Sequence, residues 1–191
     1  MANTMNARQI MKRTATASTI PTIPSSSDHT DGTWLATDIY KGEMFYNEAN
    51  DSLWTRGTNG IVHLGGRAKL VIPTAQVLTL NSVPVAFGLT VPTGYAIQGI
   101  TASLKLDFNS VAYATNTQVK LLINGAAQYQ FIFNSAVLAS AANTFNSVGM
   151  GALSGNNLIS ATDMTVTVNA GNPTAGNSDI TIYLTYVLIK I

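Results

Sequence analysis

Histidine, cysteine and acidic side chains do most of the chemistry in proteins, and this sequence of 191 residues holds few of them. It has no cysteine, which excludes a disulfide, a thiolate metal site and a cysteine nucleophile. His29 lies in the polar run SSDHTDG and His63 in the short apolar run IVHL, and neither has a second metal ligand at helical spacing. We therefore predict no metal and no cofactor, and we expect His63 to point outward from a strand.

The acidic residues are too scattered to form a catalytic or calcium-binding motif. Those before residue 52 lack the dense Asp/Asn alternation of a calcium loop, so we expect them in solvated turns. Further along, only Asp107, Asp163 and Asp179 could supply the paired carboxylates of a glycoside hydrolase, which face each other about 5 to 9.5 Å apart. No nucleophile elbow occurs, and GMGALSG lacks the lysine of a phosphate loop. The sequence therefore predicts no catalytic residue and a protein that is not an enzyme.

The charged residues are few and unevenly distributed. They make up 10% of the chain, against about a quarter in a typical soluble domain. Of the ten basic and nine acidic residues, thirteen lie in residues 1–69, so the composition changes at about residue 70. The net charge of +1 gives no reason to expect a nucleic-acid partner, and no apolar run is long enough to cross a membrane.

Local patterns divide the chain into three parts. Residues 1–30 are rich in Thr, Ala, Ser and Pro and predict an extended arm that orders on a partner; the alternative is a terminus without a role. Residues 31–70 predict a short β-meander neck, because Asp-Gly, Asn-Asp and Asn-Gly turn signals precede its apolar runs. Residues 71–191 predict a separate head domain.

The head domain has the period of two that β-strands require. In GITASLKLDF, apolar residues from Ile100 to Phe108 alternate with polar ones. The runs VAFGLTV, QVKLLI, QYQFIF, MTVTV and ITIYLTYVLIKI follow weaker forms of this pattern, and Gly- and Asn-rich loops separate them. About eight strands in this length predict an all-β fold with a jelly-roll-type β-sandwich.

Five aromatic residues stand out in the charged segment 31–57, namely Trp34, Tyr40, Phe45, Tyr46 and Trp54. The strands predicted there are about 4 to 7 residues long, too short for one chain to cover such rings, so we expect other copies of the chain to bury them. The last strand becomes apolar on both faces from Tyr186, and the outer positions of the sandwich are uncharged. Both features favour self-association. The alternative is a monomer with a low-charge surface.

Loops rich in Asn, Ser, Gly and Tyr could bind sugars, because tyrosine offers a flat apolar ring and amides offer hydrogen bonds. Tyr113 and Asn116, in the run NSVAYATNTQ, are the candidate contacts with a host surface glycan. The same composition is also found in ordinary loops, so both interpretations stay open.

The run GTWLATDIYKGEMFYNEANDSLWTRGTNGIVHL resembles short β modules of fibre and other structural proteins of tailed bacteriophages, in which a Gly-Glu or Gly-Asp turn and an acidic turn precede two aromatic strands. The runs VLTLNS and AYATNT are similar to segments of the C-terminal sandwich of phage fibres and head-decoration proteins. The resemblance covers about residues 31–125. It implies a homotrimer with a virion-anchored arm, an intertwined β neck and exposed jelly-roll heads.

We therefore expect a virion structural protein, a head or tail fibre or a capsid decoration protein, made in the host bacterial cytoplasm. Its partners would be its own copies and other virion proteins, such as the major capsid protein or tail and connector proteins. The alternative is an adhesin that recognises host polysaccharide. The residues expected in the trimer interface are Trp34, Tyr40, Phe45, Tyr46, Trp54, Tyr186, Leu188 and Ile191. Those expected in the virion anchor are Arg8, Ile10, Met11, Lys12 and Arg13.

Overall fold

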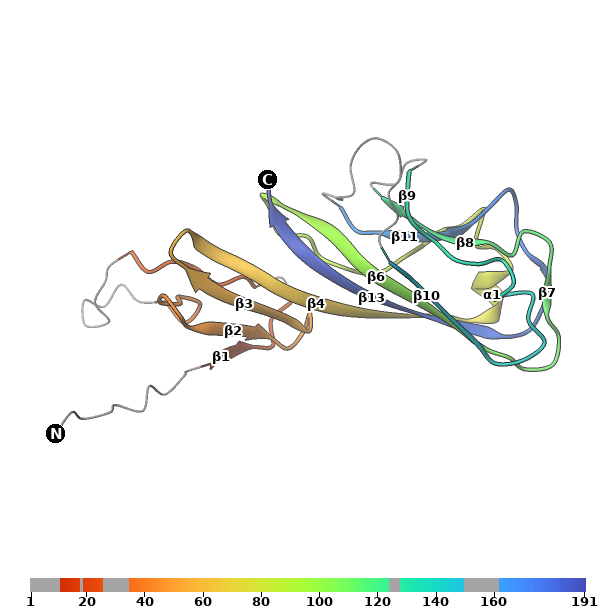
Figure 1. Ribbon diagram of the computed structural model, residues 1–191, viewed down its shortest axis with the longest axis horizontal. Coiled ribbons are helices and arrows are strands. Elements are labelled where there is room, and N and C mark those ends of the chain that lie inside the picture. The colour runs from red at the N-terminus through yellow and green to blue at the C-terminus, as the bar shows by residue number, and fades with distance from the viewer. Residues whose placement is uncertain (1–10, 18, 26–34, 124–127, 150–161) are drawn as a thin grey trace. The chain divides into compact units, whose positions relative to one another are not determined.

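The computed structural model describes residues 11–17, 19–25, 35–123, 128–149 and 162–191, which form an all-β protein with one helical turn, α1 (Thr74–Val77) (Figure 1). The predicted all-β class is confirmed. The chain divides into two compact units, unit 1 (Met1–Gly66) and unit 2 (Arg67–Ile191). The boundary falls inside strand β4 (Gly60–Ile72), a few residues before the change in composition near residue 70.

Unit 1 is built on a sheet of four short strands. β1 (Met11–Thr14) pairs in parallel with β2 (Met44–Asn47), β2 pairs antiparallel with β3 (Ser52–Gly57), and β3 pairs antiparallel with the first half of β4. The two hairpin turns lie where the sequence predicts them. Asp51 has a φ of 45° and Gly60 a φ of 117°, in the left-handed region that Asp tolerates and glycine favours.

Three expectations for this region are wrong. Residues 11–14 are not part of an extended arm, because they form β1 at the edge of the sheet. Within TWLATDIY, residues 35–40 form a turn and an isolated bridge between Thr22 and Asp38 rather than a strand. β4 is also much longer than the run IVHL, since it continues without a turn to Ile72.

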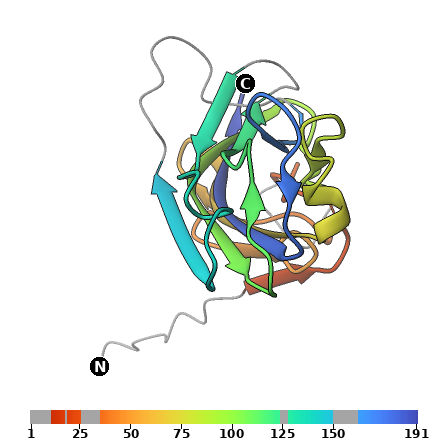
Figure 2. The same cartoon turned by 90° about the vertical axis from the view of Figure 1, so that its right-hand side faces the viewer.

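Unit 2 contains two four-stranded sheets and a two-stranded ribbon. The first sheet has the order β4-β13-β6-β10, and the second has the order β5-β11-β8-β9. β7 and β12 pair antiparallel and lie side by side in Figure 2. Of the predicted strand VAFGLTV, only β5 forms. The strands are β5 (Val85–Ala86), β6 (Tyr95–Asp107), β7 (Tyr113–Ala114), β8 (Val119–Ile123), β9 (Gln128–Ile132), β10 (Thr144–Gly149), β11 (Thr165–Val168), β12 (Thr174–Ala175) and β13 (Asp179–Lys190).

The core of unit 2 lies between its two sheets. β6 and β13 run antiparallel along most of their length (Figure 1), and Leu104, Leu106 and Ile182 on these strands are completely buried. Leu121 and Val166 of the second sheet belong to the same cluster of buried side chains. Two sheets thus enclose one apolar core, which is the arrangement of a β-sandwich.

A β-bulge overturns one prediction for β6. The register with β13 shifts between Thr185 and Tyr186, which pair with Thr101 and Gly99, so no residue of β13 lies opposite Ile100. Ile100 is 38% exposed, whereas simple alternation places it in the core. The extra residue of a bulge changes which face the following side chains occupy, and the sequence carries no periodic signal for it.

Candidate functional site

The sheet of unit 1 has two faces of different character. Cross-strand pairing places Lys12, Phe45, Trp54 and His63 in one row on what we name the inner face. Phe45 and Trp54 are each 1% exposed, and His63 is buried edge-on against Trp54 with ring centroids 4.5 Å apart. Burial lowers the pKa of His63 to about 4, so this histidine is neutral at pH 7.

Irregular segments of the same chain cover the inner face. Asn47 on this face donates hydrogen bonds to the carbonyls of Thr16 and Thr19, at 3.0 and 2.9 Å. Arg56, further along β3, donates to the carbonyl of Ile39 at 2.9 Å, and Ile39 is completely buried. Described segments between β1 and β2 therefore lie over the inner face and cover its buried side chains.

Two predictions about these rings are therefore wrong. Phe45 and Trp54 do not need other copies of the chain for their burial, because non-repetitive segments that leave no periodic signal supply the cover. His63 does not point outward; its neighbours Val62 and Leu64 do, and each is about half exposed. The alternation of IVHL is compatible with either set facing the core, so only the tertiary packing selects one.

Lys12 ties β1 into unit 1, which contradicts its expected role in a virion anchor. Its ammonium group lies 3.7 Å from Glu43 Oε2 and donates a hydrogen bond to the carbonyl of Asp38, and its side chain is 14% exposed. Glu43 Oε2 also accepts a hydrogen bond from the backbone N–H of Tyr40 at 2.8 Å. A partner protein could not reach a charge that is enclosed and paired in this way.

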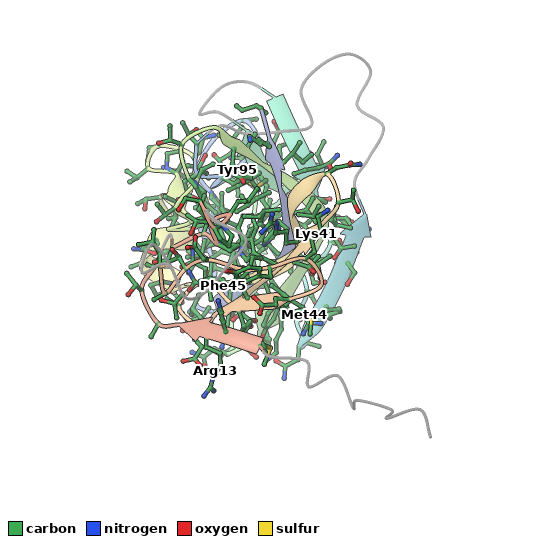
Figure 3. The ribbon with its side chains drawn as sticks, turned by 90° about the vertical axis from the view of Figure 1, so that its left-hand side faces the viewer. Arg13, Lys41, Met44, Phe45 and Tyr95 are labelled. Atoms are coloured by element: carbon green, nitrogen blue, oxygen red, sulfur yellow. The ribbon has the colours of Figure 1, made fainter. Side chains whose placement is uncertain are left out.

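The other residues expected in the anchor lie differently. Arg13 points away from β1 (Figure 3) and pairs with Glu48 at 3.3 Å, with both side chains largely exposed. Met11 is 49% exposed. Arg8 and Ile10 lie outside the described residues.

The opposite face of this sheet, which we name the outer face, is largely apolar and open. Met11, Val62 and Leu64 are 49%, 52% and 50% exposed. Antiparallel sheets with one covered face usually present polar residues on the other, so this face is unusual for a free surface. Its members on the four strands are Met11, Arg13, Met44, Tyr46, Leu53, Thr55, Val62 and Leu64.

The remaining aromatic residues of the predicted neck are not enclosed like Phe45 and Trp54. Tyr46 lies on the outer face, half-buried, and its hydroxyl donates a hydrogen bond to Asp51 at 2.5 Å. Tyr40 is also half-buried. Trp34 lies outside the described residues. An interface position for these three residues therefore stays a prediction.

The first sheet of unit 2 carries two exposed aromatic rings on its outward side. Tyr183 on β13 pairs with Ser103 on β6, and Phe145 lies on β10 one row further along. Tyr183 is 40% exposed and Phe145 is 60% exposed. The Ser103 and Ser147 hydroxyls lie 2.7 Å apart, and the Lys69 ammonium lies 6.0 Å from the centre of the Tyr183 ring. Lys105, which lies opposite Phe145 on β6 and pairs with Asp107, is on the same side. The result is an open surface of rings, hydroxyls and charged groups.

Sequence reasoning did not single out these two rings. The alternation in ITIYLTY contains the signal for Tyr183, because the isoleucines at 180 and 182 must face the core together. Phe145 had no such signal, since it lies at the start of a short strand after a small-residue loop. Only the pairing of β10 with β6 places it on this surface.

The loop residues proposed to contact glycans serve instead to hold the loops together. The Tyr113 side chain is 2% exposed, and its hydroxyl donates a hydrogen bond to the carbonyl of Ser178. The Asn116 amide donates to the carbonyl of Asn172 at 3.0 Å. The prediction for Tyr113 is wrong because a sugar cannot stack on a buried ring, and the Asn116 amide nitrogen is committed to a loop contact.

Two of the three acids considered for catalysis do meet, but in structural roles. Asp107 and Asp179 are directly opposite each other on β6 and β13. Asp107 pairs with Lys105 at 2.6 Å, whereas Asp179 Oδ1 accepts hydrogen bonds from the backbone N–H and hydroxyl of Thr74 at 2.8 and 3.2 Å. Asp163 accepts a hydrogen bond from the Gly88 N–H at 2.6 Å. Asp163 and Asp179 thus each fix a neighbouring segment, whereas Asp107 pairs within its own strand.

The predicted interface residues near the C-terminus divide into two kinds. Tyr186 is 3% exposed and belongs to the core of unit 2, so its expected place between subunits is contradicted. Leu188 is half-buried and packs against the same core. Ile191 is 66% exposed and stays available to a partner.

No protein-family model, curated protein or solved structure matches the chain. Within the described residues, no group of three or more His, Cys, Asp or Glu side chains could hold a metal ion. No helix in that part of the chain is long and apolar enough to span a membrane. The open sheet faces are therefore the features from which a function can be inferred.

Proposed function

We propose that the chain is a homotrimeric structural protein of a bacteriophage virion, a head or tail fibre or a capsid decoration protein. Residues near its N-terminus attach it to another virion protein, such as the major capsid protein or a tail or connector protein, and unit 2 is exposed. The observation that carries the proposal is the scarcity of charge on a chain with open apolar sheet faces. Residues 71–191 contain six charged residues, while Phe145 and Ile191 are 60% and 66% exposed.

The physical reason is solubility. A free monomer normally keeps its sheet faces soluble with dispersed charge, whereas a subunit of a permanent assembly places uncharged faces against its neighbours. Burying a Ser, Thr or Met face in a subunit contact avoids the several kcal/mol that desolvating an ion costs. The outer face of unit 1 is largely a face of this kind, with Val62 and Leu64 about half exposed, and this is what supports an assembled rather than a free protein.

The strand order of unit 2 supports a jelly-roll connectivity for the head. Numbered one to eight along the chain, its eight main strands β4, β5, β6, β8, β9, β10, β11 and β13 occur in the orders 1-8-3-6 and 2-7-4-5. Strand one therefore neighbours eight, two neighbours seven, three neighbours six and four neighbours five. This is the pairing of one long hairpin wrapped into two sheets, as in a jelly roll.

Electron microscopy of intact particles tests the proposal. A peptide tag at the C-terminus, labelled with antibody-coated gold, should mark regular positions on particles from cells that make the tagged chain. The same tag on an unrelated host protein is the control and should leave particles unlabelled. Recovery of the chain only in the particle-free fraction would contradict a role in the virion.

A second candidate is an adhesin that binds host surface polysaccharide, and one observation favours it. The exposed rings of Tyr183 and Phe145 lie on one face with the Ser103 and Ser147 hydroxyls. Sugar rings stack on exposed aromatic rings, and their hydroxyls form hydrogen bonds with serine. The contact surface in this candidate is the outward side of the first sheet rather than the loops.

Glycan-array binding by the purified chain tests this second candidate. Replacing both rings, in the variant Tyr183→Ala with Phe145→Ala, should abolish binding because the stacking surface is lost. Ile132→Ala, at a position 39% exposed on the other sheet, is the matched control and should bind like the wild type. Equal binding by the double variant would exclude this face as the sugar site.

A further inference from the structure

We propose that the outer face of unit 1 is a contact between copies of this chain. This inference rests on the proposed homotrimer and names the surface through which its subunits meet. It lies on the side of the sheet opposite to the buried rings of Phe45 and Trp54. The neck contact is thus formed mainly by aliphatic and methionine side chains, with Tyr46 among them.

The two faces of the sheet explain why only one of them needs a partner. The inner face is already closed by the chain, with Phe45 and Trp54 each 1% exposed. On the outer face, Val62 and Leu64 of β4 and Met11 of β1 remain about half exposed at opposite sides of the sheet. Between them Met44, Tyr46 and Leu53 are only half-buried. The apolar surface therefore extends across all four strands.

Leu64 belongs to this surface together with Val62. The two residues are two positions apart on β4, so simple alternation places them on the same side, and the residue between them, His63, is buried. The register between β3 and β4 shifts between Leu53 and Trp54, which pair with Gly65 and His63, so no residue of β3 lies opposite Leu64. Leu64 is 50% exposed at this position.

The charges at this face select a second copy as the occupant. Arg13 lies on the face and pairs with Glu48 at 3.3 Å, and the Asp51 carboxylate accepts a hydrogen bond from the hydroxyl of Tyr46 on the same face. Rotational symmetry places the same residues of every copy around one axis, where unpaired like charges would repel. A face on which these charged groups already have partners within the unit is compatible with that arrangement, and its apolar side chains suit an uncharged surface rather than a strongly charged partner.

The outer face is too small to form a stable interface by itself. Four strands about 4.8 Å apart and about four residues of about 3.3 Å along each give a surface on the order of 250 Å². A stable interface buries about 800 Å² on each partner. The face is therefore one component of a larger contact, so a change there should weaken assembly by a measurable factor.

Sedimentation velocity at micromolar concentrations tests the proposal with a charge placed at Val62. Every variant also carries Trp34→Phe, so that tryptophan fluorescence reports only Trp54, which is buried on the inner face. Because Trp34 is itself a predicted interface residue, the parent with Trp34→Phe alone is first compared with the wild type and is then the reference for the variants. Val62→Lys should raise the dissociation constant about tenfold or more, because each copy brings an unpaired cation to the contact. Its Trp54 emission should stay that of a buried ring, since Val62 points away from it. Thr58→Lys, in the exposed β3–β4 turn, is the matched control and should assemble like the wild type.

Three results would overturn the proposal, and they differ in whether they also contradict the homotrimer. If Val62→Lys assembles like Thr58→Lys, the contact lies elsewhere and the homotrimer stands. If the wild type is a 20.2 kDa monomer at every concentration, the homotrimer itself fails. If Val62→Lys exposes Trp54, the milder variant Val62→Thr decides, since it keeps the β-branched shape. An unchanged dissociation constant for Val62→Thr would then overturn the proposal.

Discussion

At the scale of single residues, the closest fit in unit 2 is between Gly176 and Tyr113. Gly176 has a φ of 82°, and a Cβ atom placed there would lie 2.5 Å from Cγ and Cε1 of the Tyr113 ring. The ring is held in place because its hydroxyl donates a hydrogen bond to the carbonyl of Ser178. Glycine is therefore required both for its backbone conformation and for the space its missing side chain leaves.

Replacing this glycine should destabilise unit 2. Gly176→Ala is expected to lower the free energy of unfolding by about 3 kcal/mol, from the left-handed backbone and the overlap with the Tyr113 ring together. Urea denaturation followed by circular dichroism measures this loss. Gly88→Ala is the matched control, because Gly88 has a φ of 77° and, its chain neighbours apart, no atom of the described residues would lie within 4 Å of an added Cβ atom. It should cost about 1 kcal/mol. Equal losses of stability in the two variants would show that the Tyr113 ring moves aside without cost.

At the scale of elements, a β-bulge changes which side chains are exposed. Register shifts occur between β6 and β13, between β3 and β4, and between β8 and β9. The first leaves Ile100 without a partner on β13 and 38% exposed, against the simple alternation of β6. A bulge adds one residue that has no partner on the neighbouring strand, so the side chains on one side of it change faces. The exposure of Ile100 therefore depends on strand pairing and not on composition alone.

The pairing of β3 with β4 also makes unit 1 sensitive to acid through His63. The pKa of histidine in an unfolded chain is about 6.5, whereas burial lowers the pKa of His63 to about 4. Between pH 4 and pH 6.5 the unfolded state therefore binds more protons than the folded state. Stability that is fully present above pH 6.5 is therefore lost as the pH falls toward 4, by up to about 3 kcal/mol. Urea midpoints from Trp54 fluorescence in the Trp34→Phe protein, taken between pH 7 and 4, measure the loss.

Two histidine variants separate this effect from general acid denaturation. His63→Gln removes the titrating group, so its urea midpoint should change much less between pH 7 and 5 than that of the parent protein. His29→Gln removes the other histidine of the chain and should keep the parent's pH dependence. The assignment to His63 is wrong if His63→Gln retains the full loss in this range.

At the scale of the whole molecule, amide side chains hold irregular segments in both units. In unit 1 the amide of Asn47 donates to two backbone carbonyls, beside the ion pair of Lys12 with Glu43. In unit 2, Asn177 Oδ1 accepts from the backbone N–H groups of Ser110 and Val111, at 3.2 and 2.9 Å. Such uncharged loop contacts help residues 71–191 to fold with six charged residues.

These contacts also bear on assembly. Neutral amides can hold the loops of a subunit without adding charges that would repel between copies. In unit 1, Lys12 pairs with Glu43 and Arg13 with Glu48, so these four charges have partners within the unit. Both kinds of contact are compatible with close approach of identical chains, which the proposed homotrimer requires.

The sequence by itself determined those features that depend on neighbouring residues. The all-β class, the long strands β6 and β13, and the hairpin turns at Asp51 and Gly60 all follow from alternation and turn chemistry over a few positions. A change in composition near residue 70 is also visible in the sequence, and the boundary between the two units lies a few residues before it.

Only the tertiary structure decided what each face meets. It turned Trp54 and His63 inward beneath irregular segments, buried Tyr113 and Tyr186, and left Val62 and Leu64 exposed. Alternation of residue types along a strand shows that its two faces differ, but not which face is covered. The covering segments are distant along the chain and have no periodic pattern. The rings of residues 31–57 pointed to a surface that needs a partner, and the fold places the open apolar surface on the opposite side of the same strands.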